Sequence, residues 1–192
     1  MAGSQETPLT EDEREEIVLA AKSVFKKLKN LYDKVAPTFQ DYGFTPPSAG
    51  VIARDLSEKI EKAIIQHCHS FTKGTGHCDL GRLGDNWEVK VCKDSGLTIN
   101  QSKQVAGENY IVVNYTSNIQ VRSVWVLWNA SDGLFSPRKA NSNARSLLLT
   151  AAQPHLEILF SGGGSKQASL PMPGKAKSAK AELSVKAKKQ TA

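Results

Sequence analysis

The chain lacks the features that mark membrane and secreted proteins. Its 192 residues contain no apolar run near the length of about 18 residues that a transmembrane helix needs. Residues 1–16 are polar and acidic, unlike a secretory signal peptide. The three cysteines are few and odd in number, so a disulfide framework is not expected. We therefore expect a cytoplasmic protein that has reduced thiols and makes no contact with a membrane.

Most of the chain also lacks an excess of positive charge. The formal net charge is +6, from 25 basic and 19 acidic residues. Residues 163–192 hold seven of the lysines and one glutamate, which accounts for the whole excess. The other 18 basic and 18 acidic residues cancel, so the net charge of residues 1–162 gives no reason to expect nucleic-acid binding. The glycine-rich stretch 161–165 predicts a linker, and residues 163–192 a disordered basic tail that can attract a polyanion.

Helical signals dominate the first third of the chain. Thr10 and Glu13 have the spacing of a capping box, and apolar residues follow at intervals of three and four. We expect a helix over about 10–35 that ends before Pro37 and offers a surface for a homodimer. Prolines and glycines over 37–50 indicate a loop. A second helix is expected over about 50–70.

The hydrophobic period then changes from helical to two. The expected strands are 77–81, 86–93, 110–115, 121–128 and 155–160, of which the third and fourth read as central strands buried on both faces. Residues 97–106 indicate a short helix or a loop. Pro137 is expected to open a helix over about 137–152. This order predicts one mixed α/β (α+β) domain over 1–162, with its core at about 50–160, in which helices flank a mixed central β-sheet.

The most informative segment is the predicted hairpin between Asp79 and Lys90. On a strand, Glu88 and Lys90 point to one face, and the apolar residues beside them point to the other. Burying these two charges costs free energy, so each of them needs a charged partner or a functional reason to be there. A turn at Leu83-Gly84 places Asp79 opposite Glu88, and a turn at Gly84-Asp85 places it opposite Lys90. Both registers leave Asp79 on the face of Glu88 and Lys90.

These side chains have the chemistry of a metal-dependent hydrolase. Two neighbouring carboxylates repel each other and favour a divalent cation, and hard oxygen ligands suit Mg²⁺ or Mn²⁺. A lysine beside them can orient a water molecule or neutralise developing phosphate charge. Together they form a minimal set for phosphodiester hydrolysis.

Asp79, an interval of eight residues and Glu88-Val89-Lys90 resemble the PD-(D/E)xK nuclease superfamily, which has the restriction-endonuclease-like fold. The resemblance covers about residues 50–130, and Cys78 stands where the family has a proline. It implies that Asp79 and Glu88 bind the metal and that Lys90 assists the attacking water. It also implies accessory roles for a glutamate on the preceding helix and a polar residue after the strand; the candidates are Glu58 or Glu61, and Gln101.

The function implied by this resemblance is Mg²⁺- or Mn²⁺-dependent hydrolysis of nucleic acid by a DNA endonuclease. Arg138, Lys139 and Arg145 lie in the helix expected over 137–152 and are candidates for phosphate contacts near its N-terminus. The alternative is a non-catalytic module on the same scaffold that binds nucleic acid or protein. A surface ion pair and a nuclease-like fold without activity also remain open for Asp79, Glu88 and Lys90.

Other reactive residues suggest weaker alternatives. A structural zinc site has the candidate ligands His67, Cys68, His69, His77, Cys78 and Cys92, but no pair has the spacing of a zinc motif. A Cys-His hydrolase lacks a visible nucleophile turn. The three tryptophans, on strands poor in basic residues, are expected in the core rather than stacked on bases.

Overall fold

The computed structural model describes residues 7–45, 55–76, 78–93, 96–100, 103–139 and 141–162. Its centre is a six-stranded mixed sheet with the strand order β1-β2-β3-β5-β6-β8. The strands are β1 (Thr72–Lys73), β2 (Leu80–Arg82), β3 (Asp85–Lys93), β5 (Ala106–Tyr115), β6 (Val121–Ser131) and β8 (Leu156–Ser161). β3 and β5 are parallel, and the other neighbours are antiparallel. The expected mixed α/β architecture is confirmed.

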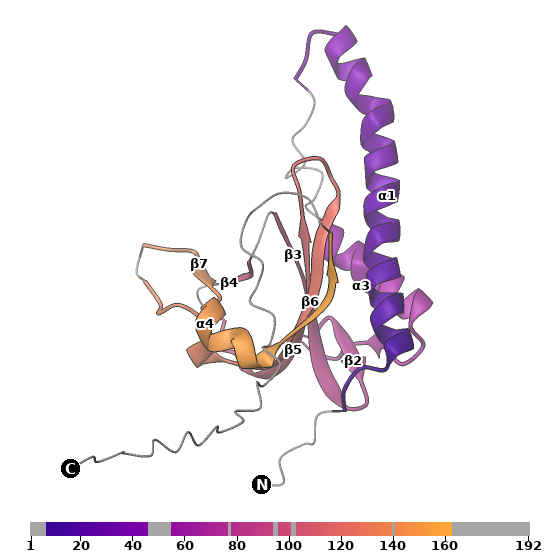
Figure 1. Cartoon of the computed structure of the whole chain (residues 1–192). Helices are drawn as coiled ribbons and strands as arrows, with labels where there is room; N and C mark the ends of the chain where they lie inside the picture. Colours follow the sequence, from indigo (N-terminus) through magenta and orange to yellow (C-terminus); the bar gives the residue numbers. More distant parts are fainter. Residues whose placement is uncertain are drawn as a thin grey trace, which may run out of the picture.

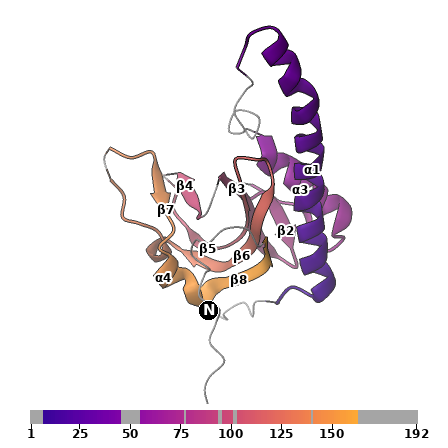
Figure 2. The ribbon, with the colours of Figure 1, turned by 45° about the horizontal axis from the view of Figure 1, so that its top comes forward.

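Different elements cover the two faces of this sheet (Figure 1). The helices α1 (Glu11–Asp41) and α3 (Leu56–His67) pack on one face. The other face carries a two-stranded sheet of β4 (Thr98–Asn100) and β7 (Ala144–Ser146), the short helix α4 (Leu149–Ala152) and 3₁₀ turns at Asp132–Leu134 and Gln153–His155. Figure 2 shows these smaller elements opposite α1 and α3. Among the described residues, no helix has the length and apolar character needed to cross a bilayer.

The start of α1 lies where the sequence predicts it, whereas the end of α1 does not. The Thr10 Oγ1 accepts a hydrogen bond from the Glu13 amide, and a Glu13 carboxylate oxygen accepts one from the Thr10 amide, which confirms the capping box. The helix then passes through Pro37 to Asp41, so the expected end before Pro37 is wrong. Proline removes one amide donor, and the rest of the turn remains helical.

The signal that ends α1 is Gly43, six residues beyond Pro37, and the last helical residue is Asp41. Gly43 has φ +76°, a left-handed conformation that glycine adopts without a steric penalty. The Phe44 amide donates to the Phe39 carbonyl and the Gly43 amide to the Gln40 carbonyl, which together form a Schellman motif. The glycine therefore stops the helix where the proline does not.

The β2–β3 hairpin has one of the two registers that the sequence allowed. Arg82 pairs with Asp85, so Leu83 and Gly84 form the two-residue turn. Both turn residues have positive φ, 51° and 90°, as a type I′ hairpin turn requires. In this register the position of Asp79 lies opposite Glu88.

Two segments on the outer face differ from the expected elements. Residues 98–100 form β4, not a helix or loop, and pair with β7. The helix expected over 137–152 is wrong, since β7 and the four-residue α4 replace it. The Ser142 hydroxyl accepts a hydrogen bond from the Ala144 amide, a local contact that competes with helix formation.

The remaining expectations are largely confirmed. β5 and β6 have buried residues on both faces, β8 forms, and Trp87 and Trp125 lie in the core. β1 was not expected, and α3 begins later than predicted. Residues 46–54 and the basic tail 163–192 lie outside the described residues.

Candidate active site

Asp79 and Glu88 are positioned by the backbone of the hairpin. Glu88 lies on β3 between β2 and β5, on the sheet face opposite α1, and only 4% of it is exposed. Asp79 directly precedes β2, and its amide donates to the Trp87 carbonyl at 3.1 Å. The Asp79 Oδ2 accepts a hydrogen bond from the Val89 amide at 2.8 Å. This bond holds the carboxylate at the end of the hairpin beside Glu88.

Two lysines share the Glu88 carboxylate. Lys90 Nζ lies 2.6 Å from Glu88 Oε2 and 3.9 Å from Asp79 Oδ2. Lys103 Nζ lies 2.6 Å from the other oxygen, Glu88 Oε1. Burial alone would raise the pKa of Glu88, but hydrogen bonds from Lys103 and Lys90 outweigh it and lower the pKa below its ordinary value. Glu88 is therefore ionised at neutral pH despite its burial.

Lys103 is a site residue that the sequence did not reveal. It precedes β5 and reaches back to β3, and it also lies 3.1 Å from the Glu108 carboxylate. The Tyr110 hydroxyl donates to the same carboxylate at 2.7 Å. Burial opposes the charge on Lys103, but hydrogen bonds to Glu88 and Glu108 raise its pKa. No periodic pattern links Lys103 to Glu88, because the contact depends on the crossover from β3 to β5.

The structure distinguishes the two helix glutamates. Glu58 is exposed and pairs with Lys62 one turn along α3. Glu61 is partly buried, and its pKa is raised by burial and by the Asp79 carboxylate. Of the two alternatives, Glu61 is the one that lies within the electrostatic reach of the site.

The cluster carries more negative than positive charge. Glu61, Asp79, Glu88 and Glu108 contribute four carboxylates, against the ammonium groups of Lys90 and Lys103. Among the described residues, no three His, Cys, Asp or Glu side chains are already placed to hold a metal ion together. Mg²⁺ takes one or two carboxylates and fills its shell with water and phosphate oxygens. The oxygen donors of Asp79 and Glu88 fit such an ion.

The basic residues expected to contact phosphate are not gathered on a helix N-terminus. Arg145 is 3% exposed, pairs with Asp132 at 2.7 Å and donates to the Ser136 and Asp132 carbonyls. It holds a loop in place and is not presented to a ligand. Arg138 is exposed and donates to the Lys103 carbonyl, and Lys139 is exposed.

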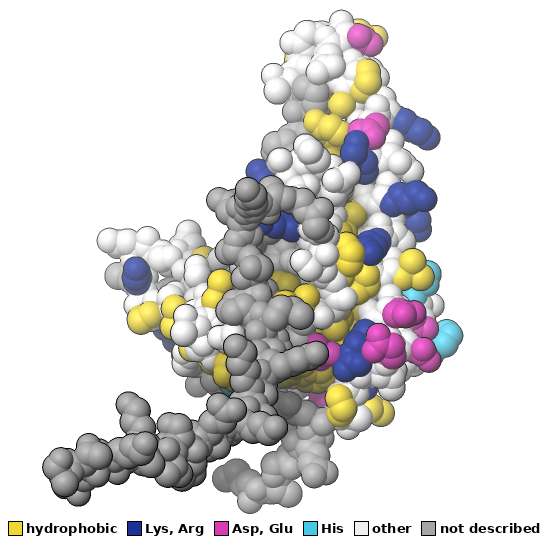
Figure 3. All heavy atoms as spheres, viewed as in Figure 1, with side chains coloured by type: hydrophobic (Ala, Val, Ile, Leu, Met, Phe, Trp, Pro, Cys, Tyr) yellow, Lys and Arg dark blue, Asp and Glu magenta, His cyan; other side chains and the backbone are white. Residues whose placement is uncertain are grey.

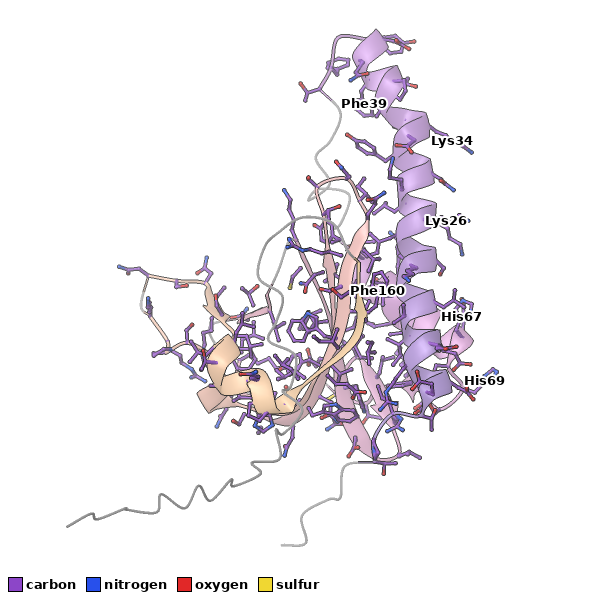
Figure 4. The ribbon with its side chains drawn as sticks, in the orientation of Figure 1. Lys26, Lys34, Phe39, His67, His69 and Phe160 are labelled. Carbon is purple, nitrogen blue, oxygen red and sulfur yellow. The ribbon has the colours of Figure 1, made fainter. Side chains whose placement is uncertain are left out.

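The described zinc candidates do not converge. Cys68 is buried and its Sγ lies 3.3 Å from the Ser70 hydroxyl. His67 and His69 lie on the outer side of the molecule, away from the sheet (Figure 4). Burial raises the pKa of the Cys78 thiol, which does not favour a thiolate ligand. Gln101 and His77 lie outside the described residues.

No protein-family model matches the chain, and no curated protein matches it either. The chemistry of the site therefore has to be inferred from its residues. The carboxylates of Asp79 and Glu88 lie beside Lys90, and Lys103 contacts the other oxygen of Glu88. This arrangement can bind a hard cation and place an ammonium group beside it.

Proposed function

We propose that the protein is a Mg²⁺- or Mn²⁺-dependent nuclease that hydrolyses phosphodiester bonds in DNA. The observation that supports this best is the position of Lys90 Nζ, 2.6 Å and 3.9 Å from the carboxylates of Glu88 and Asp79. The three residues have the order and spacing of the PD-(D/E)xK motif. The helix α3 precedes the hairpin and carries Glu61, whose pKa is raised by burial and by the Asp79 carboxylate. A restriction-endonuclease-like fold is part of this proposal.

In this proposal each residue of the site has a separate role. Asp79 and Glu88 would hold the cation, which when bound supplies a Lewis acid for the scissile phosphate. Lys90 donates a hydrogen bond to the attacking water and opposes the negative charge that develops on phosphorus oxygens. Lys103 stays on Glu88 and Glu108, so it keeps Glu88 ionised and correctly oriented. Glu61 is the additional carboxylate from the helix.

Most of the attraction to DNA would come from residues 163–192, because residues 1–162 have no net charge. The seven lysines of residues 163–192 provide a sequence-independent attraction to DNA that weakens as salt rises. The exposed Arg138 donates to the carbonyl of Lys103, whose side chain contacts Glu88. The tail thus raises the encounter rate, and the hairpin performs the cleavage.

A second candidate function has its own support. Each oxygen of Glu88 already accepts a hydrogen bond from a lysine, which satisfies the carboxylate without a metal. An ion-pair network of this kind would also suit a non-catalytic module that binds nucleic acid or protein. The two functions differ in whether a divalent cation displaces a lysine.

Cleavage assays on the full chain distinguish them. Supercoiled plasmid, linear duplex and single-stranded DNA are incubated with Mg²⁺ or Mn²⁺ at low salt. We expect Lys90→Met and Glu88→Gln to lower cleavage by about 100-fold or more. Lys93→Met, on the exposed end of the same strand, is the matched control and should leave cleavage unchanged. Absence of cleavage on every substrate by a folded wild-type chain would favour the binding module.

A further inference from the structure

A groove lies between the first turns of α1 and the edge strand β8, and its volume is about 720 Å³. β8 is the last strand in the order of the sheet, and no described strand pairs with its outer edge. The apolar side chains that line the groove are Val18 and Leu19 from α1, and Ile158 and Leu159 from β8. Leu19 is 56% exposed and Ile158 is 37% exposed. The groove therefore offers apolar surface beside an open sheet edge.

The groove is also negatively charged. Five acidic and two basic side chains line it. Both basic side chains already have partners within the molecule. Arg14 lies 3.1 Å from the Glu11 carboxylate and 2.6 Å from that of Glu157. Lys22 Nζ lies 3.6 Å from the centroid of the Phe160 ring.

Two further carboxylates of the groove are not neutralised in this way. Asp12 and Glu15 are exposed and form no ion pair with another described residue. Asp12, Glu15 and Leu19 follow one another at intervals of three and four, which places them on one side of α1. Figure 3 shows acidic side chains gathered over the first turns of α1 and basic side chains along its middle. A basic segment with apolar residues is the partner that fits this combination.

The C-terminal part of the same chain has these complementary properties. Residues 183–189 read Leu-Ser-Val-Lys-Ala-Lys-Lys and contain three lysines and no acidic residue. In an extended segment, Leu183 and Val185 lie on one side, because neighbouring side chains alternate between sides. We propose that residues 183–189 bind in the groove between α1 and β8 of their own chain. Leu183 and Val185 would cover its apolar side chains, and the lysines would lie beside Asp12 and Glu15.

The point at which the tail leaves the sheet favours this occupant. The Gly162 amide donates to the Arg122 carbonyl at 2.8 Å, so the tail begins at the end of β8, beside the groove. A flexible connection over residues 163–182 spans about 25 Å on average. The groove follows α1 from Glu11 to Lys22, a length of about 18 Å. The segment can therefore reach the groove, and the tether gives it a local concentration on the order of millimolar.

Docking in the groove would limit what else the tail can bind. Lysines held beside Asp12 and Glu15 are not available to a polyanion, so the groove and DNA would compete for residues 183–189. Salt screens exposed charges, so the docked segment should be released as salt rises. The docking itself does not depend on the proposed function, and it is tested without a substrate.

Nuclear magnetic resonance of the full ¹⁵N-labelled chain at low salt tests the proposal. Asp12→Asn combined with Glu15→Gln should weaken docking by about 5-fold, because two exposed ion pairs are lost. The amide shifts of residues 183–189 should then move toward their values at about 0.5 M salt. Asp41→Asn combined with Glu58→Gln also removes two exposed carboxylates, but away from the groove, and should leave these shifts unchanged.

A second pair of variants tests the docking from the side of the tail. The tail variant carries Lys186→Gln, Lys188→Gln and Lys189→Gln, and its matched control carries Lys175→Gln, Lys177→Gln and Lys180→Gln. Both remove three positive charges from the tail. The tail variant should shift the amide signals of Leu19 and Ile158 in the groove, whereas its control should leave them in place.

Dilution of the wild-type chain separates docking within one chain from exchange between two copies. A 10-fold dilution, about 500 to 50 µM, should leave the signals of residues 183–189 unchanged, because the tether fixes the local concentration. Signals that change on dilution overturn the proposal and assign the groove to the tail of a second copy. Equal responses of the groove variant and its control overturn it too. So do shifts of residues 183–189 that are the same at low and high salt.

Discussion

Two buried ion-pair clusters among the described residues differ in how completely their charges are matched. At one, the Arg82 guanidinium donates to both oxygens of Glu13 at 2.8 Å and to the Thr7 and Pro8 carbonyls at 2.7 and 3.0 Å. One positive and one negative charge cancel there. At the other, two lysines face several carboxylates, and negative charge is in excess.

Under the proposed function, the arginine cluster keeps its partners and the lysine cluster exchanges them. A guanidinium is a rigid planar fork that binds a carboxylate through two parallel hydrogen bonds, so Arg82 ties the start of α1 firmly to the hairpin. A lysine ammonium is a point charge on a flexible stem. Lys90 can therefore leave Glu88 when a cation or phosphate arrives, which suits a site that binds a ligand.

Removing the arginine should have the largest effect on stability. We expect Arg82→Met to lower the free energy of unfolding by about 3–5 kcal/mol, because Glu13 is left as a buried charge without its partner. Lys103→Met should cost less, since Glu88 retains Lys90. Urea unfolding of both variants measures the two losses. Equal or reversed losses would show that the two clusters do not differ in this way.

Acid should weaken the arginine cluster with a defined pH dependence. Burial opposes ionisation of Glu13, but hydrogen bonds from Arg82, Ser70 and Thr10 outweigh it and lower the pKa from 4.5 to about 2. The unfolded chain binds this proton at higher pH than the folded chain does. The stabilisation, about 3 kcal/mol, is thus complete above pH 5 and is lost as the pH falls toward 2.

This pH dependence is isolated by a pair of variants. The difference in unfolding free energy between the wild-type chain and Glu13→Gln should shrink steadily between about pH 5 and pH 3. Glu15→Gln, on the exposed side of the same helix, is the control for the removal of one carboxylate. A difference that does not change with pH would contradict the lowered pKa of Glu13.

Divalent cations should act on the lysine cluster alone. At a Mg²⁺ or Mn²⁺ concentration 100 times the Kd, we expect a stabilisation of about 2.7 kcal/mol, seen as a rise in Tm. Glu61→Gln should reduce this rise, because it removes a carboxylate close to Asp79, whereas Glu58→Gln should not. An equal response in both variants would remove Glu61 from the site.

Local signals predicted the hairpin but not everything that surrounds it. The period-two pattern around Glu88 and Lys90 and the Gly84 turn depend only on neighbouring residues, so the sequence sufficed to place the two charges on one face. The choice between two turn positions needed the structure. Lys103 comes from a crossover whose path no local pattern encodes, and choosing Glu61 over Glu58 required knowing how α3 sits against the hairpin.

The two errors in the helices have different physical origins. Pro37 predicted the end of α1 because proline weakens helices, but the Schellman motif at Gly43 is the stronger stop. The apolar run at Leu147 to Leu149 resembled one face of a helix. In the structure Leu147 is buried beside β7, whereas Leu148 and Leu149 are exposed. A local glycine signal determines the end of α1, whereas tertiary packing determines the conformation of residues 147–149.

The two-residue turn at Leu83-Gly84 restricts how this chain can vary in evolution. Because side chains on a strand alternate between faces, a one-residue slip in the pairing of β2 with β3 would move Asp79 to the opposite side of the sheet from Glu88. A slip of two residues would preserve the alternation. Related sequences that keep the function should therefore preserve this pairing register or shift it by two residues, whereas a related chain with a one-residue slip should also have lost the Asp79 carboxylate.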